Sequence, residues 1–389
     1  MSWEIKKLSE CCASIADGDH QAPPKADSGI PFVTISNINS TNQFDFTNTM
    51  FVPQAYYDGL DSKRKAQKGD VLYSVVGSFG IPVYMRETVP FVFQRHIAIL
   101  RPNDAILPQF LYYTMLSRDF YMMADAAALG AAQRTVSLTA LRNMKIAVPP
   151  MDVQKKIVDI LSAYDELIEN NQKQIKLLEE ASQRLYKEWF VDLRFPGHET
   201  TPITDGIPEG WKRAKLIDIV KVQYGYAFDG SLFNANGKGV PIVRIRNIPA
   251  GTTADYTTEE ADTQYIVHNG DILVGMDGEF HINSWSGPDA YLVQRTCSFR
   301  PNNPNMKGYL LQAIYEPIKY FESTVVGATV AHLGKKHVDT ITVLTGPKEL
   351  YVPFQQYFER RQLLLNQNRL LAESRDRLLP KLMNGEIEV

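Results

Sequence analysis

Residues 149–195 constrain this chain more than any other stretch, because no proline or glycine occurs between Met151 and Phe195. Residues taken alternately three and four apart form a largely apolar seam with two polar members: Ile157, Leu161, Tyr164, Ile168, Asn171, Ile175, Leu178, Ser182, Leu185 and Trp189. This spacing is typical of a coiled coil. A helix from Val153 to Leu193 would be roughly 60 Å long. So long a helix is expected to pack against a second one.

The C-terminal residues 354–387 supply the predicted partner helix. Its apolar positions recur every seven residues in two adjacent rows: Tyr357, Leu364, Leu371 and Leu378 beside Phe358, Leu365, Ala372 and Leu379. Asn171 and Asn368 fall on or beside the two seams. Two interpretations stay open for these asparagines: they fix the register of the helices at some cost in stability, or each is simply half exposed.

Composition limits the remaining possibilities. A chain of 389 residues with 44% hydrophobic residues has the size of two or three domains. Its three cysteines are poorly spaced for disulfides, the N-terminus lacks the apolar run of a signal peptide, and no segment approaches roughly 18 consecutive apolar residues. We therefore expect a soluble, cytoplasmic protein. The net charge of −3 argues weakly against a simple nucleic-acid binder, so phosphate contacts would need local basic clusters.

The sequence contains an internal duplication. Segments of the first half recur in the same order in the second half: Trp3 and Trp211, GIPFVTISNIN from Gly29 and GVPIVRIRNIP from Gly239, KGDVLYSVVGSFG from Lys68 and NGDILVGMDGEF from Asn269, FQRHIAILRP from Phe93 and VQRTCSFRP from Val293. The duplication predicts four parts: a domain over 1–148, a central helix over 149–197, a second domain over 198–350 and a C-terminal helix over 351–389.

Each half-domain is predicted to be α+β. The alternating residues 31–36 and 241–246 indicate strands, the second with Arg244 and Arg246 on one face. Helical stretches follow near 109–128 and 307–323. Each domain then closes on a glycine-containing loop and a final strand, and in the first domain Ser137 is positioned to cap a short helix.

Most sequence signals for catalysis are absent. The chain contains no P-loop, no GxGxxG after a strand, no HExxH and no zinc-type pairing of Cys or His. His332 and His337 are separated by lysines, which favours a surface loop over a metal site. The Asp/Asn-Pro-Pro-aromatic tetrapeptide that amino-methyltransferases use does not occur either. We therefore expect no catalytic activity from this chain by itself.

Three motifs carry a resemblance to a known family. They are Pro149, Pro150 and Gln154 at the start of the first helix, Trp189-Phe190-Val191-Asp192 at its end, and Gly385-Glu386-Ile387 at the C-terminus. With the duplication, they make the whole chain resemble the specificity subunit of a type I restriction-modification system. The second helix departs from the pattern, because it begins VPFQQYF without a double proline.

The resemblance implies two target recognition domains, each of which reads one half of a split, asymmetric DNA site, and an antiparallel helix pair that spaces them. It also implies partners: two methyltransferase subunits, which bind S-adenosylmethionine and methylate adenine, and restriction/translocase subunits. The chain itself would hold no cofactor. The alternatives are a coiled-coil adaptor that binds only proteins, and an enzyme with an unfamiliar site.

Base edges are best approached by Arg, Lys, Gln and Asn side chains, while other basic residues position phosphates. In the first domain the DNA-binding candidates are Lys63, Arg64 and Lys65 for phosphate, and Ser78, Gln133 and Arg134. In the second domain they are Arg244, Arg246, Asp277, Glu279, His332, Lys335 and Lys336. Asp277 is included because a carboxylate accepts from cytosine N4. Alternatively, the lysine-rich turn is merely solvated, and Arg244 and Arg246 pair with acidic neighbours.

Two further groups of residues have competing interpretations. The pairs Gln94-Arg95 and Gln294-Arg295 recur in domains expected to read different bases, which favours a structural role or a phosphate contact. Tyr186, Trp189 and Phe190 crowd the end of the first long helix and are candidate partner-binding anchors. Alternatively, these aromatic residues pack against the second domain at Trp211.

Overall fold

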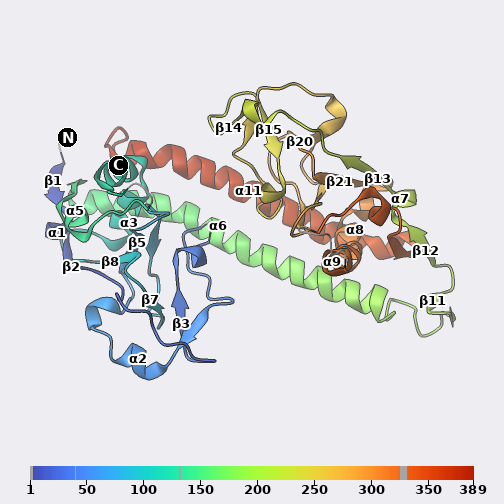
Figure 1. Ribbon diagram of the computed structural model, residues 1–389, viewed down its shortest axis with the longest axis horizontal. Helices are drawn as coiled ribbons and strands as arrows, with labels where there is room; N and C mark the ends of the chain where they lie inside the picture. Colours follow the sequence, from blue (N-terminus) through green and yellow to red (C-terminus); the bar gives the residue numbers. More distant parts are fainter. Residues whose placement is uncertain (1–2, 40, 131–132, 325–330) are drawn as a thin grey trace. The chain divides into compact units, whose positions relative to one another are not determined.

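The computed structural model describes residues 3–39, 41–130, 133–324 and 331–389. Residues 131–132 and 325–330, which belong to the two predicted glycine-containing loops, lie outside the described residues. The chain forms two compact units: Met1–Glu166 with Ala372–Val389, and Leu167–Leu371. We call them unit 1 and unit 2. Each unit contains one globular domain and a segment of each long helix (Figure 1).

The two long helices are α6 (Met151–Tyr186) and α11 (Val352–Met383). A π-helical turn, Lys187–Val191, continues α6, and a 3-10 turn, Lys348–Tyr351, precedes α11. All ten seam residues predicted on α6 and all eight predicted on α11 are buried or half-buried. The predicted helix pair and its apolar faces are therefore confirmed.

Gln154 anchors the first turn of α6. Its side chain is 1% exposed, and its Oε1 accepts a hydrogen bond of 2.8 Å from the backbone N–H of Leu107. Its Nε2 donates to the carbonyl of Pro149 at 2.9 Å. The glutamine thus satisfies a backbone N–H at the start of α3 (Pro108–Leu116) and a backbone carbonyl just before α6, which would be costly to bury without partners. Pro149 and Pro150 bring the chain into the helix in a fixed extended conformation.

A pair of asparagines lies between α6 and α11 in unit 2. Asn171 is 7% exposed, and its Nδ2 donates to Oδ1 of Asn368 at 2.9 Å. Any shift of register would leave a buried amide unpaired, which costs more than the bond itself contributes. The structure therefore favours the register-fixing interpretation over half exposure for Asn171.

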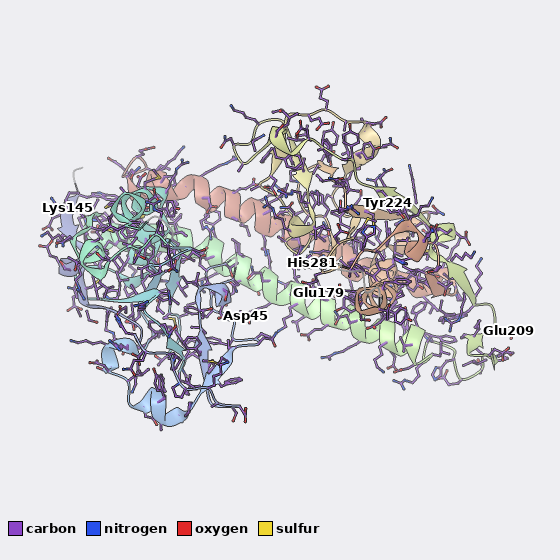
Figure 2. The ribbon with its side chains drawn as sticks, in the orientation of Figure 1. Asp45, Lys145, Glu179, Glu209, Tyr224 and His281 are labelled. Atoms are coloured by element: carbon purple, nitrogen blue, oxygen red, sulfur yellow. The ribbon has the colours of Figure 1, made fainter. Side chains whose placement is uncertain are left out.

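Charged side chains tie the helices to the domain in each unit. In unit 2, the guanidinium of Arg361 on α11 donates to the carboxylate of Glu179 on α6 at 2.6 Å; Glu179 is labelled in Figure 2. The same guanidinium donates to Ser284 Oγ of the domain, also at 2.6 Å. In unit 1, Arg375 of α11 contacts Asp165 of α6 at 2.6 Å, and the Tyr113 hydroxyl donates to that carboxylate at 2.7 Å. These contacts run antiparallel along the helices.

The domain of unit 1 is built on two small sheets. The first is antiparallel with order β2-β8-β5-β6, and the second has order β4-β3-β7. The strands are β2 (Cys12–Asp17), β3 (Ile30–Val33), β4 (Met50–Val52), β5 (Val71–Ser74), β6 (Pro82–Tyr84), β7 (Val92–Phe93) and β8 (Ile97–Pro102), with β1 (Glu4–Lys7) paired to β9 (Lys145–Val148). The helices are α1 (Leu8–Cys11), α2 (Gln54–Asp58), α3 (Pro108–Leu116), α4 (Arg118–Ala127) and α5 (Leu138–Asn143).

The domain of unit 2 repeats this topology. Its sheets have the orders β13-β21-β18-β19 and β14-β16-β15-β20-β17, and β12 pairs with β22. The elements are β12 (Lys212–Lys215), β13 (Val220–Tyr224), β14 (Phe233–Asn234), β15 (Val240–Val243), β16 (Tyr256–Thr257), β17 (Ile266–Val267), β18 (Ile272–Gly275), β19 (Ile282–Ser284), β20 (Ala290–Leu292), β21 (Thr296–Pro301), β22 (Thr342–Thr345), α7 (Leu216–Ile219), α8 (Lys307–Ala313), α9 (Tyr315–Thr324) and α10 (Lys335–Val338). A hairpin, β10 (Ile203–Thr204) and β11 (Ile207–Pro208), precedes them. The α+β duplication is confirmed.

Two strands are shorter than the sequence predicts. β3 ends at Val33 and β15 at Val243, and each turns at once into a 3-10 helix. The cause is an asparagine, Asn37 or Asn247, whose Oδ1 accepts the backbone N–H three residues earlier at 2.8 Å. Such local bonding competes with the strand ladder. Arg244 therefore stands at the start of a turn and not on a strand face.

The other predicted helices and the predicted helix cap agree with the structure, except that each helical stretch divides in two. The stretch near 109–128 divides into α3 and α4 because the Ser117 hydroxyl accepts the Phe120 N–H at 3.2 Å and starts a new helix. The stretch near 307–323 divides likewise into α8 and α9. Ser137 caps α5 as predicted, with its Oγ accepting the Ala140 N–H at 3.1 Å.

An equivalent buried ion pair between an aspartate and an arginine stabilises each domain. In unit 1, Arg101 of β8 binds Asp70 through two bonds of 2.9 Å, and its Nη2 also donates to the Lys65 carbonyl at 3.1 Å. In unit 2, Arg300 of β21 binds Asp271 at 2.8 and 2.9 Å. The aspartates are 1% and 5% exposed. Paired charges with these added hydrogen bonds are tolerated in a core, whereas a single buried charge is not.

We predict that Asp271→Ala lowers the free energy of unfolding by about 3 kcal/mol, because it leaves the Arg300 guanidinium, 25% exposed, without its partner. Asp70→Ala is the matched variant of unit 1 and should cost a similar amount. The exposed Asp289→Ala is the control, with an expected change within about 0.5 kcal/mol. Chemical denaturation of the full chain checks this, and equal stability of the Asp271 and Asp289 variants would contradict it.

Candidate nucleic-acid interface

An open hollow of about 590 Å³ lies on the domain of unit 1. Four loop segments form it: the turn after β3, the loop after β5, the residues before β8 and the loop before α5. The lining residues are Val33, Thr34, Ile35, Ser36, Val76, Gly77, Ser78, Ile81, Gln94, His96, Ile97 and Gln133. The hollow offers short hydroxyls, amides and one imidazole. These groups can donate to and accept from base edges.

Backbone bonds hold the loops of this hollow together. The N–H of Gly77, whose φ is +72°, donates to the Arg134 carbonyl at 3.0 Å. Val76 and Thr135 form an adjacent β-bridge. Glycine adopts this left-handed conformation without strain, so the loop after β5 turns outward and presents Ser78 to solvent. Ser78 and Gln133, both predicted from the sequence, are thus brought together.

The other residues predicted in the first domain do not line this hollow. Arg64 lies 3.2 Å from Asp19, whose pKa is lowered by a hydrogen bond from the Tyr56 hydroxyl. Lys65 donates to the Asp58 carbonyl at 2.9 Å. Lys63 is exposed. Contact of these three with phosphate stays a prediction, and two of the three side chains are already engaged.

Arg134 follows Gln133 but its guanidinium turns away from the hollow. It pairs with the Asp125 carboxylate and lies 5.5 Å over the ring of Phe79. Both contacts hold the loop before α5 against α4 and the loop after β5. They give Arg134 a structural role beside its predicted contact with DNA, which stays a prediction.

The same loop segments exist in unit 2. In unit 2 the backbone N–H of Met276 donates to the carbonyl of Arg295 at 2.9 Å. The equivalent bond in unit 1 runs from the N–H of Val75 to the carbonyl of His96, also at 2.9 Å. The bridge Asp277–His332 corresponds to Val76–Thr135. The equivalent positions of unit 1 and unit 2 are Thr34 and Arg244, Ser36 and Arg246, Val76 and Asp277, Ser78 and Glu279, His96 and Arg295, and Thr135 and His332. Side chains without a full charge in the first domain, one of them the apolar Val76, are therefore replaced mainly by charged ones in the second.

The two predicted arginines of unit 2 have different surroundings. Arg246 binds Asp255 through both Nε, at 3.1 Å, and Nη2, at 2.5 Å. Burial raises the pKa of Asp255, but the bonds from Arg246 and Asn247 outweigh it and lower that pKa overall. Arg244 lies 5.6 Å over the Phe233 ring and makes no ion pair with the described residues. Arg246 is thus paired with an acidic neighbour, whereas Arg244 acts on the same carboxylate only through its charge, which also lowers the pKa of Asp255.

Asp277 and His332 are in direct contact. Nδ1 of His332 lies 2.5 Å from Oδ1 of Asp277, and Nε of Arg295 lies 3.4 Å from Oδ2 of the same carboxylate. Glu279 is exposed and lies 3.5 Å from His281. Both oxygens of Asp277 therefore have partners within the domain, whereas Glu279 extends into solvent.

Lys335 and Lys336 open α10 on the protein surface. Both side chains are exposed, and neither forms an ion pair within the part of the chain that the structure describes. Free lysines near a loop cluster have the properties expected of phosphate contacts. Their role stays a prediction.

Tyr186, Trp189 and Phe190 pack into unit 2. Phe190 is 5% exposed and its ring centroid lies 4.7 Å from that of Tyr309 and 5.1 Å from that of Trp211. Tyr186 stacks on Phe190, and burial raises its pKa to about 12. The alternative of packing against Trp211 is thus observed, and Phe190 is not an exposed anchor. Partner binding by Tyr186 and Trp189, both half-buried, stays a prediction.

Sequence reasoning missed several residues of these loops. Thr34, Ser36, Gln94 and His96 line the hollow of unit 1 without having been predicted. The recurring Gln-Arg pair was a signal, but the strand register aligns His96 with Arg295, one residue away from the sequence match. The two turns have the same length, so the Gln-Arg match in the sequence is one residue out of the structural register.

Two kinds of feature do not occur in the described ranges. Among residues 3–39, 41–130, 133–324 and 331–389, no group of three or more His, Cys, Asp and Glu side chains is arranged to hold a metal ion. Over the same ranges, no helix has the length and apolar character required to cross a membrane.

A loop-bearing domain that occurs twice on a pair of long helices defines a two-part recognition protein. Comparison with known proteins specifies its class. Residues 2–180 and 208–368 match the family described as "Type I restriction modification DNA specificity domain". The chain belongs to this family.

Individual relatives agree with this. The MjaIX type I restriction enzyme specificity subunit of Methanocaldococcus jannaschii is 27% identical, over 74% of this chain and 71% of that protein. The HindI specificity subunit of Haemophilus influenzae is 22% identical over 92% and 95% of the two chains. The crystal structure of the type-I restriction-modification system S subunit from M. genitalium has the same fold, with a TM-score of 0.55, 15% identity, and coverage of 98% and 96%.

This chain is therefore a DNA-specificity subunit, which works in a complex with other subunits and is itself non-catalytic. The adaptor without DNA recognition and the enzyme with an unfamiliar site are not supported.

We predict that the double substitution Arg244→Ala with Lys335→Ala lowers the affinity of the complex for DNA and makes that affinity less dependent on salt concentration. For every phosphate that the variant no longer binds, the slope of log K against log salt should fall by about 0.9. The measurement is the affinity of the assembled complex for its DNA over a range of salt. Arg246→Ala is the control and should change the slope less, because Asp255 already holds that guanidinium. An unchanged affinity together with an unchanged slope in the double variant would exclude this surface.

Proposed function

We propose that each domain reads one half of a bipartite, asymmetric DNA site through its four loop segments. One observation supports this most: equivalent loops stand on the same sheet in both units but carry different side chains. A common scaffold with Thr34 and Ser78 in one unit and Arg244 and Glu279 at the equivalent positions of the other offers different donors and acceptors to the bases. Two different half-sites follow.

The residues proposed for contact with DNA fall into two groups. Ser78 and Gln133 in the first domain, and Arg244, Glu279 and His332 in the second, belong to the loop segments and are proposed to face base edges. Lys63, Lys335 and Lys336 are exposed and are proposed to position phosphates. Phosphate contacts orient the protein on the duplex and carry no sequence information directly.

The helices α6 and α11 are proposed to space the two half-sites and to bind two methyltransferase subunits. Those subunits would hold S-adenosylmethionine and transfer its methyl group to adenine, while this chain selects the site. Restriction/translocase subunits would join the same complex. Exposed apolar side chains along the helices, among them Leu167 and Leu177 on α6 and Leu363 and Leu370 on α11, support a protein-binding role.

We predict that adenine methylation in a host that expresses this chain with its methyltransferase follows a split, asymmetric motif. Single-molecule sequencing of the genome measures it. The control host expresses the methyltransferase alone and should lose the motif. An identical methylation pattern in both hosts, with the chain demonstrably present, would refute the specificity role.

Helix length is predicted to set the gap between the half-sites. Seven residues inserted into both α6 and α11 preserve the heptad and lengthen each helix by about 10 Å. The gap in the methylated motif should then grow by about three base pairs, while the bases read in each half stay the same. An insertion into α6 alone breaks the pairing with α11 and should abolish methylation. A changed base preference in either half would contradict the spacer role.

A further inference from the structure

The strand register places Arg295 at the centre of the loop cluster of unit 2. Its carbonyl accepts the N–H of Met276, and the equivalent bond in unit 1 joins Val75 to His96, which lines the hollow. Arg295 therefore occupies a position where a side chain of the first domain faces the proposed base-reading hollow. The recurring Gln-Arg pair in the sequence favoured a structural role or a phosphate contact for Arg295. The strand register removes that argument, because Arg295 aligns with His96 and not with Arg95.

The backbone of Arg295 has an unusual conformation. Its φ is +68°, in the left-handed region that side chains other than those of Gly, Asn and Asp rarely adopt. A glycine here would remove the strain, yet the residue is an arginine with a side chain that is 56% exposed. Strained backbone that persists in a folded domain is most often found where a side chain must be aimed.

The guanidinium of Arg295 is held from one side. Its Nε lies 3.4 Å from Oδ2 of Asp277, and its Nη1 lies 3.4 Å from Nδ1 of His332. Oδ1 of Asp277 contacts the same histidine at 2.5 Å. The carboxylate thus uses both oxygens to orient two neighbouring side chains. The outer edge of the guanidinium, formed by its two Nη groups, still has N–H donors directed away from Asp277.

Resting on the function proposed above, we propose that Arg295 determines one base of the second half-site and that this base is guanine. The paired N–H groups of an arginine match the O6 and N7 acceptors that guanine presents in the major groove. Asp277 is the positioning residue, because its carboxylate contacts the guanidinium. His332 supports Asp277 in turn, since its Nδ1–H donates to that carboxylate and is therefore not an acceptor for Arg295. This replaces the direct contact with cytosine predicted for Asp277.

The first domain lacks this arrangement. Val76, Thr135 and His96 occupy the positions of Asp277, His332 and Arg295, and none can present a held guanidinium. A guanine requirement that is set by this arrangement therefore belongs to the second domain. A phosphate contact by Arg295 would predict something different, because its loss would weaken binding equally at all sequences.

The test uses Arg295→Lys and Arg295→Gln in the complete system, with single-molecule sequencing of adenine methylation. Lysine keeps the charge but lacks the planar fork. We expect one guanine position in one half-site to become degenerate, with discrimination at that position reduced roughly tenfold or more. The other half-site should stay unchanged. Asp277→Asn should relax the same position, because the guanidinium loses its charged support.

Arg213→Ala is the matched control, since it removes the same charge from an exposed position of β12 in the same unit. The DNA motif methylated with the Arg213→Ala variant should match the motif methylated with the wild-type chain. Thermal melting of each variant separates a folding defect from a change of specificity. If Arg295→Gln does not fold, the motif of the Arg295→Lys variant alone tests the role of Arg295.

Three outcomes would overturn the inference. These are an unchanged motif, relaxation at a position that is not guanine, and a uniform loss of methylation with all base preferences retained. Failure of the proposed function looks different, because the wild-type chain would then direct no split motif at all.

Discussion

The amide pair of Asn171 and Asn368 fixes which turn of α6 faces which turn of α11. A slip of register would bury two unpaired amides among apolar seam residues, and this penalty exceeds what the bond contributes. Arg361, 9% exposed, adds a second constraint because it contacts Glu179 on the facing helix and Ser284 in the domain. Helix register and domain attachment in unit 2 are therefore set by the same short segment of α11.

Stability and recognition occupy different parts of each domain. The Asp70–Arg101 and Asp271–Arg300 pairs are kept in both units and hold the sheet below the loops. The loops above the sheets keep their backbone bonds but exchange their side chains. The ion pairs and the strand ladders are thus common to both domains, whereas the loop side chains differ between them.

A nearly neutral chain can still offer local positive charge to DNA. Many of its cations are neutralised within the fold: Arg64 by Asp19, Arg134 by Asp125 and Arg246 by Asp255. Lys335 and Lys336 form no ion pair within the residues that the structure describes.

The sequence by itself determined the duplication, the helix pair and the α+β class, because repeated motifs and seven-residue periodicity are local patterns. It also predicted Ser78 and Gln133, which lie in one hollow, and the Ser137 cap. Tertiary structure decided the rest: Phe190 is buried, Arg246 is held by Asp255, and Arg295 aligns with His96. These outcomes depend on strand register and on contacts between residues far apart in the chain. A sequence match that is one residue out of the structural register reverses such an assignment, and sequence spacing alone does not reveal it.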